Sequence, residues 1–290
     1  MSLKLMRAIV KTLIYADIFN YPLTEEEIWE WLVKVKSSKL KVQSAIKKLK
    51  LKKEKKEYYF LKGRRKIVDI RKKREKWSRE KIKIAKKIGN LLKIIPTIKL
   101  VGITGALAVE NSDYLDDIDL FIVTSKRLIW TTRFFTTVLV ELTGKRRRPG
   151  QSNVNNKICL NMFIDEDHLS THKKERDLFS AHEVIQMKLL WERNNTYSKF
   201  LKANEWVENY LPNALGSIKY QVASIKYENK SLFYSFLVSL LTFFERFLKS
   251  LQLLYMSKRR TKEVIRDGVI RFHPQDARKW VMEKYHQILL

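Results

Sequence analysis

Residues 98–105, Ile-Lys-Leu-Val-Gly-Ile-Thr-Gly, and residues 116–124, Asp-Asp-Ile-Asp-Leu-Phe-Ile-Val-Thr, are the two stretches that decide the fold. The first is a short apolar run that ends in Thr-Gly, which predicts a buried strand leading into a helix N-terminus. The second combines β-branched and aromatic residues with acids at alternate positions, which also predicts a strand. The sequence therefore predicts a strand, a helical turn and a second strand in succession.

The acids of the second stretch are candidate metal ligands. Because side chains alternate along a strand, Asp117 and Asp119 share one face and can reach a common cation. Backbone N–H groups at the start of the helical turn, at Thr104, Gly105 and Ala106, are placed to bind the phosphates of a nucleotide triphosphate. Paired carboxylates opposite a glycine turn suit divalent-metal phosphate chemistry, although such pairs also occur at ordinary strand ends and in Ca²⁺ loops.

In these residues the chain resembles the nucleotidyltransferase superfamily of the DNA polymerase β type, which includes kanamycin nucleotidyltransferase and the minimal nucleotidyltransferases. The matching positions are residues 101–108 and 112–120, a hydrophobic strand with its glycine turn followed by Asp-Ile-Asp. The resemblance implies an α+β protein with a small mixed-sheet core. It also implies Mg²⁺-dependent transfer of a nucleoside monophosphate from a nucleotide triphosphate to an unknown hydroxyl acceptor, with pyrophosphate release. Asp117 and Asp119 would bind two Mg²⁺ ions.

The chain departs from the family pattern at two places. Gly105-Ala106 stands where the family has Gly-Ser, so the hydroxyl that contacts phosphate is missing. The family's third acid lies in a later strand, here expected over 157–164, and its position falls on Asn161, with Asp165 as the fallback. An amide can ligate a metal but cannot act as a base at neutral pH. We therefore keep open a catalytically degenerate relative that acts as a DNA-binding regulator or a nucleotide sensor.

Helix and turn signals divide the chain into four parts. Three short helices and a small hairpin predict a winged helix-turn-helix over 1–66, and a long amphipathic helix connects it over 67–96, where Pro96 ends the helix. The nucleotidyltransferase-like core is expected over 97–175 and a helical domain over 176–290. Helices are predicted within that last part at 177–190, 197–210 and 230–256, with a short terminal helix that begins at 272–274.

The basic charge is concentrated ahead of the core. Residues 1–100 hold 30 Lys and Arg against 10 Asp and Glu, a net charge of +20 out of +28 for the whole chain. A field of that sign attracts nucleic acid, and the predicted third helix carries Gln43 and Ser44 as its few base-reading groups. Solvated lysine faces, or a module that docks a protein, explain the same composition.

The remaining features concern location and assembly. A single Cys159 excludes a disulfide framework, and no secretory signal opens the chain, so a cytoplasmic protein is expected. Residues 232–244 carry no charge but fall short of the ~20 apolar residues that span a bilayer. We expect no transmembrane segment, and oligomer formation through the C-terminal helices remains open.

Overall fold

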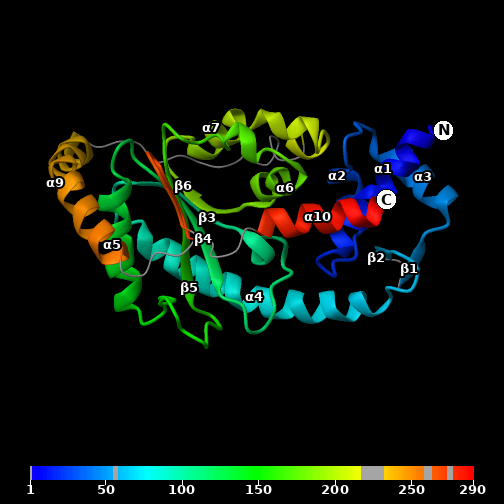
Figure 1. Ribbon diagram of the computed structural model, residues 1–290, viewed down its shortest axis with the longest axis horizontal. Coiled ribbons are helices and arrows are strands. Elements are labelled where there is room, and N and C mark those ends of the chain that lie inside the picture. The colour runs from blue at the N-terminus through cyan, green and yellow to red at the C-terminus, as the bar shows by residue number, and fades with distance from the viewer. Residues whose placement is uncertain (1, 55–57, 217–231, 258–262, 273–276) are drawn as a thin grey trace.

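A six-stranded mixed sheet forms the centre of the computed structural model, which describes residues 2–54, 58–216, 232–257, 263–272 and 277–290 (Figure 1). The strands lie in the order β6-β3-β4-β5-β8-β7. Neighbours β4 and β5 run parallel, and the other neighbouring pairs run antiparallel. The bounds are β3 Ile98–Ile103, β4 Ile118–Thr124, β5 Ile158–Asp165, β6 Lys188–Glu192, β7 Val264–Arg266 and β8 Val269–Arg271.

Helices cover both faces of this sheet because alternate residues of the central strands are apolar on each side. Val101 and Ile122 face α4 and α5, whereas Leu100 and Phe121 belong to the core that contains α6 and α7. All four of these side chains are buried, which explains the continuous apolar runs in the sequence. The helix bounds are α4 Lys66–Leu92, α5 Ile129–Leu142, α6 Leu178–Gln186 and α7 Thr196–Ala203.

The N-terminal part contains the three helices and the hairpin that the sequence predicts. Thr24 begins the second helix with the expected capping box, in which its hydroxyl accepts from the Glu27 N–H and the Glu27 carboxylate accepts from the Thr24 N–H. Helix α4 then runs from this part to the central sheet (Figure 1). The bounds are α1 Leu3–Asp17, α2 Glu25–Glu30, α3 Lys39–Leu49, β1 Lys52–Glu54 and β2 Tyr58–Phe60.

The prediction of a helix over 177–190 is wrong at its C-terminal end. Helix α6 ends at Gln186, and the next residues form the edge strand β6, which pairs with β3. Gly102 permits this pairing, since a Cβ there would lie 2.2 Å from the Met187 sulfur. Strands β7 and β8 extend the same sheet, so the part after residue 175 is not all helical. Pairing with a distant strand overrides the local helical pattern.

The C-terminal helices are α9, Leu232–Ser257, and α10, Ala277–Leu289. Helix α9 packs on α5, and α10 packs on α1 and α6. Within the described residues, no helix is both long and apolar enough to cross a membrane. The expected start of a terminal helix at His273-Pro274 lies outside the described residues. Oligomer formation stays a prediction, and α9 exposes an apolar face that contains Phe243, Phe247 and Leu254.

Candidate active site

The two predicted metal ligands lie together where β4 begins. Asp119 is the second residue of β4, and Asp117 directly precedes the strand. One ligand atom each from Asp117, Asp119 and Cys159 lie within 4.8 Å of one another. This group is a possible metal-binding site that two carboxylates and one thiol form.

The glycine turn lies against the same carboxylates. Gly105 opens the 3-10 helix η1 (Gly105–Val109) with φ +66°, and a Cβ at this position would lie 3.3 Å from Asp119 Oδ2. Glycine is therefore favoured both by its backbone conformation and by the close carboxylate. Thr104 is extended, and its buried hydroxyl has no hydrogen-bond partner among the described residues. The side chain of Ala106 is exposed.

Strand β5 places Cys159 beside the carboxylates, and the role of Asn161 as the third group stays a prediction. In the parallel register Cys159 is the partner of Asp119, and an irregularity follows before Met162 pairs with Phe121. Asn161 falls inside this irregularity and is buried, and its carbonyl accepts the Phe272 N–H. The sequence missed Cys159 because a cysteine in an apolar strand has no distinctive local pattern.

Asp165 cannot take the place of the third acid. It pairs with Thr124 at the far end of β4, six residues along β5 from Cys159. At a rise of ~3.3 Å per residue this separation is about 20 Å. Its carboxylate instead accepts the Asp167 N–H and contacts the His168 ring at 2.7 Å. The fallback prediction is therefore corrected by the length of the strand.

Burial and mutual repulsion perturb the acidic group. Burial first, and the charge of Asp117 second, raise the pKa of Asp119 to about 7. Burial and the same acids hold the pKa of the Cys159 thiol well above its ordinary value. Arg147 partly balances the charge, because its guanidinium donates to Asp117 Oδ2 at 2.6 Å and lies 3.9 Å from the Cys159 sulfur. It comes from the basic loop at residues 145–150, between α5 and β5.

The buried ammonium group of Lys81 binds oxygens of the two segments that lead into the site. Lys81 of α4 is 1% exposed, and its ammonium donates to the Asp116 carbonyl at 2.5 Å, the Tyr114 carbonyl at 3.1 Å and Asn155 Oδ1 at 3.2 Å. These oxygens belong to the segments that precede β4 and β5. The sequence held a signal for this residue, since Lys81 lies on the buried stripe of α4 that includes Ser78 and Ala85.

The side chains present fit a divalent cation in part. Two adjacent carboxylates are the oxygen ligands that Mg²⁺ prefers, whereas a thiol suits a softer ion such as Zn²⁺. Arg147 already occupies one oxygen of Asp117. The donor set therefore supports one cation on Asp117 and Asp119 more directly than the two ions that the resemblance implies.

Two neighbouring groups on α6, His182 and Glu183, have pKa values shifted far from their ordinary values. Burial lowers the pKa of His182, which stacks on Tyr15 at a centroid distance of 4.2 Å, to about 3. Burial raises the pKa of the neighbouring Glu183 to about 7, and Glu183 in turn helps to raise the pKa of Asp119. Both groups therefore favour their neutral forms in the folded protein.

The two groups predict opposite dependences of stability on pH. His182 binds its proton in the unfolded chain near pH 6.5 but in the folded protein only near pH 3, so stability falls as the pH drops through this window. His182→Phe removes this loss. We therefore expect the free energy of unfolding of the variant, relative to that of the parent, to increase by about 2 kcal/mol as the pH falls from 7 to 5. Urea unfolding at each pH measures it.

Glu183→Gln provides a control whose stability relative to the parent should change with pH in the opposite direction. The folded-state pKa of Glu183 is raised, so its contribution to stability is present below pH 4.5 and is lost as the pH rises through 7. This variant is expected to gain stability over the parent as the pH rises. Parallel profiles for His182→Phe, Glu183→Gln and the parent would contradict the burial of both groups.

Comparison of the chain with protein-family models, with curated proteins and with solved structures finds no match.

Proposed function

We propose that the chain is a metal-dependent nucleotidyltransferase. The observation that supports this most is the contact between the glycine turn and the carboxylate pair, with Gly105 next to Asp119 and Asp117 beside it. Such an arrangement puts backbone donors for phosphate next to carboxylate ligands for a cation. Transfer of a nucleoside monophosphate needs both groups at one place.

Each residue has a defined task in this proposal. Asp117 and Asp119 would hold a divalent cation, which when bound would lower the pKa of an acceptor hydroxyl and shield the triphosphate. The N–H groups at Gly105 and Ala106 bind phosphate oxygens. The acceptor oxygen forms a bond to the α-phosphorus as the bond to the β-phosphate bridging oxygen breaks, so pyrophosphate leaves and the acceptor proton passes to solvent. Arg147 must release Asp117 or share it when the cation binds.

The same proposal includes a division of the chain into an N-terminal winged helix-turn-helix and a nucleotidyltransferase core. Helices α1, α2 and α3 with the β1–β2 hairpin have the element order of a winged helix-turn-helix, followed by a nucleotidyltransferase core. The acidic start of α2 limits base reading, because Gln43 donates to Glu25 at 2.6 Å and Lys39 pairs with Glu26 at 2.8 Å. A nucleic acid on this module would contact the remaining lysines through its phosphates.

A second function, nucleotide binding without turnover, is favoured by the residues found where a third carboxylate is expected. Asn161 stands at the position predicted for the family's third acid, and the residue beside Asp119 is Cys159, whose thiol with its raised pKa is a poor base at neutral pH. A degenerate nucleotidyltransferase that binds nucleotide as a sensor or DNA-binding regulator accommodates this residue. The sensor and the enzyme share the turn at Gly105 and differ in turnover.

Release of labelled pyrophosphate from each nucleotide triphosphate, with Mg²⁺, Mn²⁺ or Zn²⁺, tests the activity. We expect metal-dependent release by the parent and background release by Asp117→Ala/Asp119→Ala, since removal of both carboxylates leaves no adjacent pair to hold the cation. The control is Asp167→Ala/Glu208→Ala, which removes two exposed carboxylates outside the site. Equal turnover in the first double variant and the parent would exclude this site.

Equilibrium binding of the same nucleotides separates the two functions. Saturable binding without pyrophosphate release, lost in Gly105→Val, would support the sensor. Valine clashes with the Asp119 carboxylate and disfavours the φ of +66°. Neither binding nor release with any of the three metals would reject both functions.

A further inference from the structure

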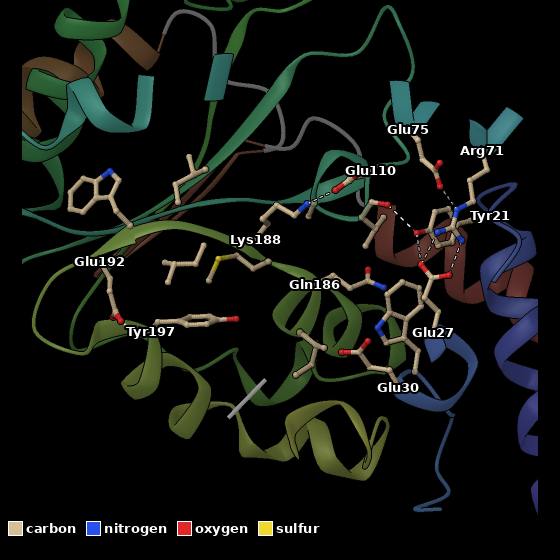
Figure 2. A pocket seen from close by; sticks show the side chains of 18 of the residues that line it. Tyr21, Glu27, Glu30, Arg71, Glu75, Glu110, Gln186, Lys188, Glu192 and Tyr197 are labelled. Carbon is tan, nitrogen blue, oxygen red and sulfur yellow. Dashed lines mark hydrogen bonds and ion pairs between the residues drawn. The ribbon is translucent and has the colours of Figure 1, made fainter. Parts of the chain in front are cut away.

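The cavity between the N-terminal helices, α4 and the edge strand β6 has charged side chains that pair with one another (Figure 2). It measures about 880 Å³. Lys188 donates to Glu110 at 2.8 Å, and Arg71 pairs with Glu27 at 2.7 Å. These pairs serve the fold. A surface without such internal partners lies on α9, at the end of the molecule opposite the N-terminal helices (Figure 1).

One face of α9 packs on the start of α5. Leu248 and Gln252, one helical turn apart, are buried, and the Gln252 amide donates to the Trp130 carbonyl at 2.8 Å. The Glu245 carboxylate accepts the N–H groups of Trp130 and Thr131 at 2.9 Å and 2.8 Å. Because Glu245 is the single acid of the helix sequence, the negative charge of α9 is turned toward the protein.

The opposite face of α9 is apolar and open to solvent. Phe243, Phe247 and Leu254 are 83%, 65% and 68% exposed. Their spacing of four and seven residues places them along one line of the helix, on the side away from Leu248 and Gln252. The exposed apolar side chains next to this line are Phe244, Leu251 and Tyr255. An apolar surface of this kind marks a place where a partner binds.

The exposed charges on the described part of α9 are positive. Arg246 and Lys249 are both exposed and flank the apolar line. The sequence has the same bias, since residues 246–262 hold six Lys and Arg and no Asp or Glu. A second copy of this chain, with its own net charge of +28, would bring like charges to this face. The negative headgroups of a lipid bilayer would instead match them.

We propose that α9 docks on the surface of an anionic lipid bilayer. Phe243, Phe247 and Leu254 enter the boundary between the headgroups and the acyl chains, and Arg246 and Lys249 contact the anionic headgroups. An apolar helix face and basic residues beside it are the two signals that stable attachment to a membrane surface requires. The helix then lies in the plane of the interface. This docking does not depend on the proposed transferase activity.

Sedimentation of the full chain with sucrose-loaded vesicles tests the proposal. One set of vesicles is phosphatidylcholine alone, and the other contains about 30% phosphatidylserine. We expect the partition coefficient on the anionic vesicles to be at least about tenfold higher, and to fall when NaCl is raised from about 0.1 M to about 0.5 M. Equal binding to the two sets, or no binding to either, would overturn the proposal.

Two double variants assign the binding to α9. Phe243→Ser/Phe247→Ser removes two apolar side chains that would enter the bilayer, and Arg246→Gln/Lys249→Gln removes two charges that would face the headgroups. Each should lower the partition coefficient on the anionic vesicles at least about tenfold. All four side chains are exposed, so the melting temperature should stay close to that of the parent.

Matched controls remove the same kinds of group elsewhere. Leu3→Ser/Leu40→Ser changes two exposed apolar side chains of the N-terminal helices, and Lys86→Gln/Lys87→Gln removes two exposed charges from α4. Both controls should bind the anionic vesicles like the parent. Binding unchanged in the folded α9 variants, or weakened as much by the controls, would place the membrane contact elsewhere and refute the proposal.

Sedimentation equilibrium without vesicles tests the competing occupant, a second copy of the chain. We expect a monomer at micromolar concentration. A dimer that Phe243→Ser/Phe247→Ser dissociates would assign the apolar face of α9 to self-association and would overturn the proposal.

Discussion

Replacement of Lys81 by methionine is expected to destabilise the protein by about 2–4 kcal/mol and to weaken divalent-metal binding at least about tenfold. The stability loss follows from three oxygens that lose their donor in a buried place, at Tyr114, Asp116 and Asn155. The loss of metal affinity follows from where Lys81 binds, directly before the candidate metal ligand Asp117. Two of these oxygens lie within the residues just before Asp117, so the carboxylate loses the anchor of its backbone.

Two measurements separate the effects, namely urea unfolding for stability and Mn²⁺ titration followed by electron paramagnetic resonance for the site. Lys83→Met on the same helix is the control, because Lys83 is 66% exposed and pairs only with Glu80 among the described residues. It removes the same charge and should change neither quantity by more than about 0.5 kcal/mol. Lys81→Arg should restore part of the metal affinity. Full metal affinity in folded Lys81→Met would show that Lys81 does not position Asp117.

The elements that the sequence predicted correctly are those that local pattern determines. The strands β3 and β4 follow from continuous apolar runs, and the start of α2 follows from Thr24 and Glu27, which satisfy each other's backbone. The approach of Asp119 to Gly105 was also predictable, since both lie at the same end of two neighbouring strands. Each of these features depends on residues close together in the chain or on the simple alternation of side chains.

The features that escaped prediction depend on distant pairing. Strand β6 forms by pairing with β3, and Gly102 leaves room for Met187 directly before it, a contact between residues far apart that helical periodicity does not reveal. Cys159 reaches Asp119 through a parallel register with an irregularity directly after it, and a shift of one residue reverses which side chains share a face. The spacing of residues along the strand therefore did not reveal that Cys159 lies beside Asp119.

Replacement of Arg71 by methionine is expected to destabilise the protein by about 3–5 kcal/mol, the cost of leaving buried carboxylates without their cation. The guanidinium is 8% exposed and pairs with Glu27 at 2.7 Å and Glu75 at 2.9 Å, and it also donates to the Pro22 carbonyl. Because Arg71 and Glu75 lie on α4 and Glu27 lies on α2, this cluster fastens the N-terminal helices to the long helix.

The cluster also reaches the C-terminal end of η1, because the single proton of the Tyr21 hydroxyl lies between Glu27 Oε1 at 2.8 Å and the Val109 carbonyl oxygen at 3.0 Å. Arg71→Met should therefore lower hydrogen-exchange protection in α2 and in η1 together. Arg79→Met, an exposed arginine on the same helix, is the control. A double-mutant cycle with Glu27→Gln measures the pair, and a coupling below about 0.5 kcal/mol would contradict a cooperative cluster. A large coupling would show that Arg71 and Glu27 stabilise the contact between α2 and α4 as a unit, and a joint loss of protection in η1 would extend that unit to Val109 through Tyr21.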